Sequence, residues 1–134
     1  MKLDRDARRC ALQAMYQFDS GSEEALDQVR DSLEGSPAAP EARAAGFELA
    51  TLAWASRQQS DEAVELISPD WPVRRQPMVD RNLLRIAYCE MKQVGTPPKA
   101  AINEAVELAK EFGGERSPGF VNGVLDRLMR QGDS

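Results

Sequence analysis

The sequence predicts an all-α fold of about seven helices. Apolar residues recur at helical spacing in every segment, and no sustained alternation with a period of two residues is present. Proline- and glycine-rich stretches at 36–40 and 68–72 mark the clearest breaks. With 134 residues the chain suits a single domain.

Three helices are expected in the first half. Residues 4–18 carry one apolar stripe, formed by Ala7, Cys10, Ala11, Ala14, Met15 and Phe18. A weaker helical pattern over about 22–34 offers Leu26, Val29 and Leu33 before the chain breaks at 36–40. The third helix, 41–59, has a stripe of Ala42, Ala45, Leu49, Leu52, Ala53 and Ser56.

Four more helices are expected in the second half. A short helix at 61–67 precedes the break at 68–72, and a longer one at about 77–94 stops at Gly95. Thr96 then offers an N-cap, with prolines in the first turn of a helix that ends at Gly113. Ser117 and Pro118 begin the last helix. The inward stripes of these last two helices are expected to include Ile102, Ala105, Val106, Ala109 and Phe112, then Val121, Val124, Leu125, Leu128 and Met129. Trp54 and Trp71 are interpreted as packing residues.

The residue inventory disfavours an enzyme and predicts no cofactor and no metal. The chain has no histidine, which removes histidine-based nucleophile relays and histidine metal sites. Cys10 and Cys89 are too few and too far apart for a zinc knuckle or a CxxC site, and we expect two small buried thiols. Glu104, Glu107 and Glu111 are interpreted as a solvated helix face. No nucleotide-binding or nucleophile-elbow motif is present, so a binding protein remains.

The net charge of −5 argues against a nucleic-acid partner until it is divided along the chain. Residues 1–18 hold four basic and two acidic residues, 19–76 hold 5 basic and 12 acidic, and 77–134 hold eight of each. The first helix is therefore locally basic although the chain is acidic. No apolar run is long enough to span a membrane, and the N-terminus lacks the pattern of a secretory signal. We expect a cytoplasmic protein.

The first helix carries the most informative constellation. Arg5, Arg8 and Arg9 stand at i, i+3 and i+4, so they share a face that Leu12 and Tyr16 continue. Guanidinium groups bind phosphates bidentately, and an aromatic side chain among them can stack on an unpaired base. The alternative is that Leu12 and Tyr16 pack on a second helix and the arginines form a solvated face.

A second candidate site lies where residues 113–119 lead into the last helix. A glycine-rich turn that opens a helix exposes backbone N–H groups at the positive end of the helix dipole, which suits a phosphate. Phe120 lies away from the main apolar stripe, and Asn122 is polar. The alternative is a capped helix whose Phe120 closes the core.

Three blocks of the second half resemble the C-terminal half of the NusB family of bacterial transcription antitermination factors. They are Leu84–Met91, Pro97–Lys110 and Phe120–Asp126, and they come in the family's order with its spacing. The opening segment Arg8–Gln17 is similar to the family's arginine-rich first helix. Residues 19–76 agree only in their helical pattern.

The resemblance implies a function in RNA recognition. It also implies a single domain of two small helical bundles, an N-terminal one over about 1–60 and a C-terminal one over about 61–131. Members of the family bind boxA, a single-stranded, U-rich element of ribosomal RNA leaders, together with a small-subunit ribosomal protein called NusE. They join the Nus complex on RNA polymerase and suppress premature termination, and some self-associate as homodimers. Carried over, the RNA-binding residues are Arg5, Arg8, Arg9, Tyr16, Phe120 and Asn122, to which we add Arg116 because it shifts the positive charge ahead of Phe120. The resemblance places the partner surface at Asp80, Arg85 and Glu90.

The sequence departs from the family pattern in the arginine-rich helix and ahead of Phe120, where Arg116 comes first and Gly119 adjoins Phe120. Asp4 and Asp6 flank Arg5, and each offsets a phosphate contact, so we expect RNA binding by the chain alone to be weak and salt-sensitive. Two alternatives stay open. One is the NusB-like domain of an rRNA cytosine-5 methyltransferase, although the sequence ends at Ser134 without a catalytic domain. The other is a protein-interaction module that has lost RNA binding.

Overall fold

The computed structural model describes residues 1–22 and 26–132, and these ranges contain helices and no β-strand, which confirms the predicted all-α fold. The helices are α1 (Arg5–Gln17), α2 (Leu26–Ser32), α3 (Pro40–Ala55), α4 (Arg57–Ile67), α5 (Met78–Cys89), α6 (Pro98–Phe112) and α7 (Ser117–Gly132). Short helical turns occupy Phe18–Ser22, Leu33–Gly35, Val73–Arg75 and Glu90–Val94. Residues 23–25 of the helix expected at 22–34 lie outside the described residues.

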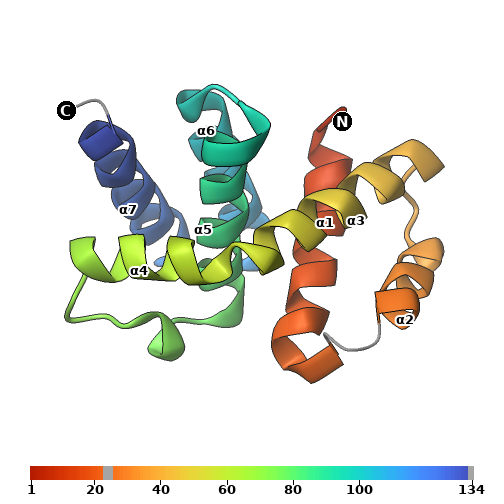
Figure 1. Cartoon of the computed structure of the whole chain (residues 1–134), viewed down its shortest axis with the longest axis horizontal. Coiled ribbons are helices and arrows are strands. Elements are labelled where there is room, and N and C mark those ends of the chain that lie inside the picture. Colours follow the sequence, from red (N-terminus) through yellow and green to blue (C-terminus); the bar gives the residue numbers. More distant parts are fainter. Residues whose placement is uncertain (23–25, 133–134) are drawn as a thin grey trace.

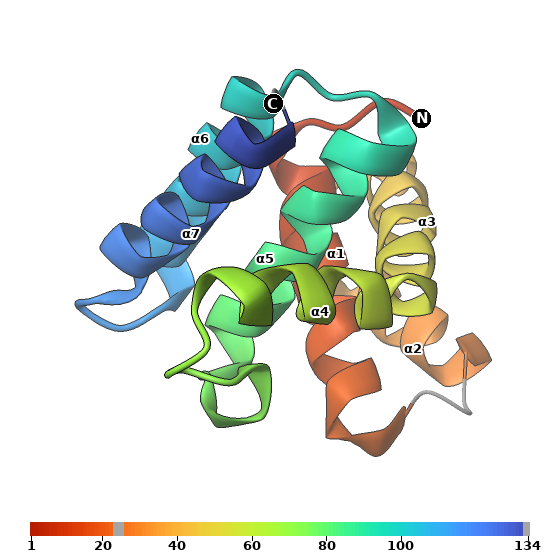
Figure 2. The same cartoon turned by 60° about the vertical axis from the view of Figure 1, so that its left-hand side comes forward.

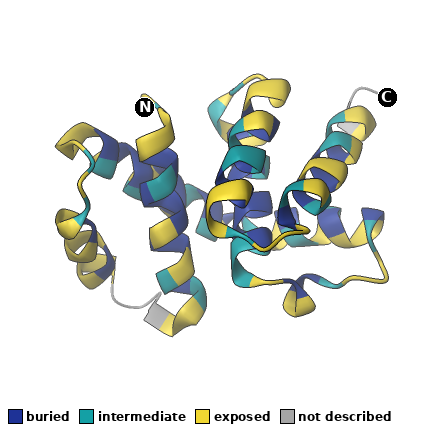
Figure 3. Cartoon of the chain, turned by 180° about the vertical axis from the view of Figure 1, so that it is seen from behind, coloured by how far each residue is buried: buried dark blue, intermediate teal, exposed yellow. Residues whose placement is uncertain are grey.

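Helices α1, α2 and α3 lie on one side of the molecule and α4, α6 and α7 on the other, with α5 between them (Figure 1). Helix α5 packs against α1, α3, α4, α6 and α7 (Figure 2). Buried residues line the inward sides of the helices while exposed residues cover the outward sides (Figure 3). One hydrophobic core, which runs from Cys10 to Leu128, joins both halves of the chain. No helix of the described ranges is long and apolar enough to cross a bilayer.

Helices α1 and α3 are in close contact at Gly46. A Cβ atom added there would collide with the carbonyl oxygen of Ala7 and lie 2.6 Å from the Cβ of Cys10. Ala7, Ala42 and Ala45 form a small buried cluster beside this contact. The run of small residues in α3 therefore lets its backbone lie directly against α1.

The boundary between α3 and α4 lies four residues earlier than the sequence pattern predicts. Helix α3 ends at Ala55, and Ser56 leaves the helical conformation with φ −100° and ψ 11°. The Ser56 hydroxyl donates to the carbonyl oxygen of Leu52 at 3.0 Å, so it competes with the backbone ladder at that turn. Residues 53–60 contain no proline or glycine, so the apolar period alone did not indicate that a helix ends there.

The connection from α5 to α6 also differs from the prediction, because Thr96 is not the N-cap. Gly95 has a positive φ of 85°, and the backbone N–H groups of Gly95 and Thr96 both donate to the carbonyl oxygen of Glu90. The Thr96 hydroxyl donates to the Glu90 carboxylate at 3.0 Å instead of capping α6. Pro97 is the residue before α6, and its side chain makes no capping hydrogen bond.

Three side chains expected to pack inward are exposed. Leu26 and Phe112 lie on the surface, and Trp71 is 43% exposed. Trp54 does pack as predicted, with its ring centroid 5.8 Å from that of Phe18. These exposed residues lie near helix ends or in connections, where a helical period is a weak guide to orientation.

A polar cluster at the N-terminal part of α5 joins that helix to the turn Phe18–Ser22 after α1 and to α4. Asp19 accepts hydrogen bonds from Arg81 at 2.6 and 2.9 Å, from Asn82 at 3.0 Å and from Arg85 at 3.3 Å. Arg85 also donates to both carboxylate oxygens of Asp61 in α4. Burial alone would raise the pKa of Asp19, but the hydrogen bonds from Arg81 and Asn82 hold this pKa below its usual range.

This cluster predicts a specific loss of stability in acid. A carboxyl whose pKa is lower in the folded state stabilises the fold above its unfolded pKa of about 3.9, and that stabilisation disappears as the pH falls through the folded pKa. Between about pH 5 and about pH 2.5 the wild-type chain should therefore lose more unfolding free energy than Asp19→Asn. Urea unfolding at the two pH values measures both losses. Equal losses in the two proteins would contradict the prediction.

Candidate nucleic-acid interface

Helix α1 exposes only a narrow stripe to solvent, because α3 and α5 cover it from two sides. The helix begins at an N-cap formed by Asp4, whose carboxylate accepts from the backbone N–H of Ala7 at 2.8 Å. The side chains that remain accessible on α1 are Arg5, Asp6, Arg9, Gln13, Tyr16 and Gln17. Two of the three predicted arginines and the predicted aromatic residue thus share one accessible surface, which we call the α1 stripe.

Arg8 does not lie on the α1 stripe. It is only 7% exposed, and its Nε and Nη2 atoms donate to the Glu90 carboxylate at 3.0 and 2.7 Å. Its Nη1 atom donates to the carbonyl oxygen of Leu3 at 2.9 Å. Arg8 therefore joins α1 to the end of α5. Its buried guanidinium is not accessible to an RNA phosphate. Leu12 is buried as well.

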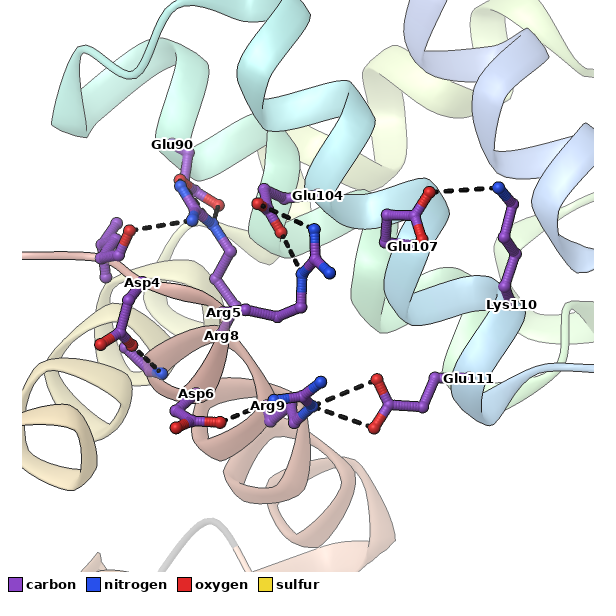
Figure 4. Close-up of polar contacts among 12 residues, drawn as sticks. Asp4, Arg5, Asp6, Arg8, Arg9, Glu90, Glu104, Glu107, Lys110 and Glu111 are labelled. Carbon is purple, nitrogen blue, oxygen red and sulfur yellow. Dashed lines mark hydrogen bonds and ion pairs between the residues drawn. The ribbon is translucent and has the colours of Figure 1, made fainter. Parts of the chain in front are cut away.

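Arg5 and Arg9 are accessible but already paired with carboxylates of α6 (Figure 4). Arg5 donates to Glu104 through Nε at 3.0 Å and through Nη2 at 3.4 Å. Arg9 donates through Nε to both oxygens of Glu111, at 2.9 and 3.1 Å, and through Nη1 to Asp6 at 2.6 Å. The hydrogen bond to Glu104 raises the pKa of Arg5, and those to Glu111 and Asp6 raise the pKa of Arg9.

An open groove of about 640 Å³ runs beside the α1 stripe. Tyr16 and Phe112 line it and are 49% and 47% exposed, and Arg9 lies at its polar edge. The other lining residues are Asp6, Leu12, Gln13, Gln17, Ser36, Pro37, Ala38 and Val79. Two accessible aromatic rings, two carboxamides and a guanidinium in one groove suit an unpaired base. Phe112 was predicted to pack inward but is exposed. Its position in the last turn of α6, before Gly113, is the sequence feature that would have indicated this.

The start of α7 keeps part of its predicted character. The Ser117 hydroxyl accepts from the backbone N–H of Gly114 at 3.0 Å and is buried, so the turn is closed by its own side chain. Arg116 and Asn122 are exposed, and the described residues place no carboxylate on Arg116. Phe120 is half-buried against the core. The region thus presents one unpaired cation at the N-terminal end of a helix dipole.

The three residues predicted to contact a protein partner lie in the interior. Asp80 and Arg85 are buried in α5, and Glu90, at 1% exposure, accepts the hydrogen bonds of Arg8 and Thr96. Arg85 pairs with Asp61 and Asp19, and Glu90 pairs with Arg8, whereas the buried Oδ1 of Asp80 has no hydrogen-bond partner among the described residues. Arg85 and Glu90 therefore connect α5 to its neighbours.

The cysteines are confirmed as free, buried thiols. Burial raises the pKa of Cys89 to about 11, and the hydrogen bond with Ser56 offsets this only in part. A thiol with so high a pKa is almost entirely protonated at neutral pH, which makes it a poor nucleophile.

Comparison with known proteins agrees with this architecture. The family model described as NusB family matches residues 5–130. The transcription antitermination protein NusB of Anaeromyxobacter dehalogenans is 42% identical over 125 residues, which cover 91% of this chain and 87% of the relative. That of Chloroflexus aggregans is 43% identical over 126 residues, covering 91% and 83%.

Solved structures show the same fold. A crystal form of T. maritima NusB superposes with a TM-score of 0.83 at 29% identity, covering 97% of this chain and 93% of that one. A chain in the crystal structure of antitermination factors NusB and NusE in complex with dsRNA gives a TM-score of 0.80 at 23% identity, covering 95% and 96%. The family match over nearly the whole chain and relatives above 40% identity lead to one conclusion: this chain belongs to the NusB family.

Proposed function

We propose that this chain is a transcription antitermination factor that binds boxA-type single-stranded RNA of ribosomal RNA leaders. It acts with a NusE-type ribosomal protein within the Nus complex on RNA polymerase, in the cytoplasm and without catalytic activity of its own. Its effect is to suppress premature termination. The relatives that support this function are antitermination proteins, and the chain covers 83% to 87% of their length.

The observation that carries the proposal is the α1 stripe beside the aromatic groove. RNA phosphates bind the guanidinium groups of Arg5 and Arg9, and an unpaired base enters the groove and stacks on Tyr16. Phe112 bounds the same groove. Arg116 and Asn122 at the start of α7 offer a second contact, next to the partly exposed ring of Phe120.

The ribosomal-protein partner is proposed to raise the affinity of this surface for RNA. The arginines of the α1 stripe are matched by acidic residues, so the chain alone has little free positive charge to offer. A second RNA-binding protein held beside it adds contacts without a second loss of translational freedom. The partner docks through residues other than the buried Asp80, Arg85 and Glu90.

Loss of the two accessible arginines should weaken RNA binding. We expect Arg5→Ala/Arg9→Ala to reduce affinity for a boxA-like RNA by about tenfold and to flatten the salt dependence, because each phosphate contact contributes about 0.7 to the slope of log K against log salt for single strands. Fluorescence anisotropy with partner present, at several salt concentrations, measures both. Lys92→Ala/Arg130→Ala is the matched control, since it removes the same charge from residues outside the groove.

The comparison of boxA-like and scrambled RNA decides the proposal. Wild-type chain and partner together should prefer the boxA-like strand, and equal binding of both strands would refute the assignment. Unchanged RNA affinity in Arg5→Ala/Arg9→Ala with intact partner binding would instead support a pure protein-interaction module. The methyltransferase-domain alternative is not favoured, because the relatives matched over most of their length are antitermination proteins.

A further inference from the structure

We propose that Glu104 and Glu111 of α6 set the RNA affinity of this chain by occupying the guanidinium groups that phosphates would bind. The inference rests on the proposed RNA-binding function and adds two determinants that lie outside the RNA-contacting residues. Both glutamates come from a helix far from α1 in sequence, and both reach across to the α1 stripe (Figure 4).

The carboxylates take the donor atoms that a phosphate needs. Glu104 accepts from two nitrogens of Arg5, the Nε and Nη2 pair that forms a bidentate contact with an oxyanion. Arg9 is held from two sides, with Glu111 on Nε and Asp6 on Nη1. A phosphate therefore reaches the Nε side of either guanidinium only by displacing a carboxylate, and the glutamates reduce the donors and the net positive charge that remain for it.

The orientation toward α1 is specific to these two glutamates. Glu107 lies between them on α6, yet it pairs with Lys110 of its own helix at 3.1 Å. Arg116, the cation at the start of α7, has no carboxylate partner among the described residues. The acidic residues thus neutralise the α1 stripe in particular and leave the second contact region charged.

The pairing is weak enough to be reversed. Ion pairs between accessible side chains are typically worth a factor of about five or less in an equilibrium. An RNA strand that also gains base contacts in the groove can overcome two such pairs. A polyanion that offers phosphates alone gains much less, because non-specific binding depends almost entirely on phosphate contacts. The glutamates therefore lower indiscriminate binding to RNA.

The test compares Glu104→Gln/Glu111→Gln with the wild type and with Glu34→Gln/Glu48→Gln. The control makes the same charge change at exposed residues of the other half of the chain. We expect the α6 variant to bind scrambled single-stranded RNA about tenfold more tightly, with a salt slope steeper by about 1.4 for two additional phosphates. It should also elute from phosphocellulose at higher salt. The control should stay within about twofold of the wild type.

A second variant shows whether the glutamates act through the arginines. In Arg5→Ala/Arg9→Ala/Glu104→Gln/Glu111→Gln the gain should vanish, since the freed guanidinium groups are absent. A gain that persists there, or an α6 variant that behaves like its control on both RNA and phosphocellulose, overturns the inference and leaves the proposed function standing. If wild-type chain with partner shows no preference for boxA-like RNA, the proposed function fails, while phosphocellulose still reports whether the arginines are masked.

Discussion

Replacing either Arg8 or Glu90 by alanine is expected to lower the free energy of unfolding by about 3–5 kcal/mol. The two side chains form a buried pair joined by hydrogen bonds of 2.7 and 3.0 Å, and within residues 1–22 and 26–132 neither group contacts another side chain of opposite charge. Removing one member leaves a buried charge without compensation. Removing Arg8 also leaves the carbonyl oxygen of Leu3 without its donor, and removing Glu90 leaves the hydroxyl of Thr96 without its acceptor.

Urea unfolding followed by circular dichroism measures this loss. Arg9→Ala is the matched control on the same helix, because an accessible ion pair contributes about 1 kcal/mol or less. The double replacement Arg8→Met/Glu90→Leu should cost clearly less than the sum of the single losses, since it leaves no unpaired charge. Single losses no larger than that of Arg9→Ala would show that Arg8 faces solvent, as the sequence pattern had suggested.

Gly46→Ala is expected to destabilise the chain by about 2–3 kcal/mol, although the same change in an open helix stabilises it. The added methyl group would meet the carbonyl oxygen of Ala7 and the Cβ of Cys10, both of them held by α1. The two helices must then move apart along their shared contact. This cost exceeds the gain of about 1 kcal/mol that alanine brings to a helix interior.

Gly123→Ala supplies the comparison with the opposite sign. Gly123 lies within α7, and nothing lies within 4 Å of the Cβ that alanine would add there. We expect this variant to gain about 0.5–1 kcal/mol in unfolding free energy. Thermal and urea unfolding of both variants should give changes of opposite sign. Stabilisation by Gly46→Ala would mean that α1 and α3 are not in close contact at this position.

Sequence periodicity predicted the helices because nearly every one of them buries a single apolar stripe. The stripe of α1 from Ala7 to Phe18 is buried throughout, and α7 begins at Ser117 as expected. The errors lie where a side chain changes the local hydrogen bonding. Ser56 ends α3 early by donating to its own helix, and Thr96 donates to Glu90 instead of capping α6.

The candidate site was predictable in part for a similar reason. Spacing places Arg5, Arg8 and Arg9 on one side of a helix, but it does not tell how many neighbours pack there. Because α3 and α5 both cover α1, the accessible stripe is narrow enough to include Arg5 and Arg9 and exclude Arg8. Tyr16 remains accessible and lines the groove, so the predicted stacking residue is available.

What the sequence missed depends on contacts between distant segments. Glu104 and Glu111 have the pattern of a solvated face, and only the approach of α6 to α1 shows that they meet Arg5 and Arg9. Asp80 and Arg85 are charged residues on a helix that is covered from several sides, which no local pattern reveals. Charge identifies residues that need a partner, but it does not tell whether that partner is internal.

The central position of α5 also determines where this sequence can change. Of the 12 residues of α5, eight are buried, and five other helices pack around it. A surface helix has a solvent side on which substitutions change stability little, whereas α5 has almost none. Any exchange in this helix must suit both halves of the molecule at once. Substitutions that change stability little are therefore expected mainly in the outer helices. The sequence of α5 should change more slowly than theirs during evolution.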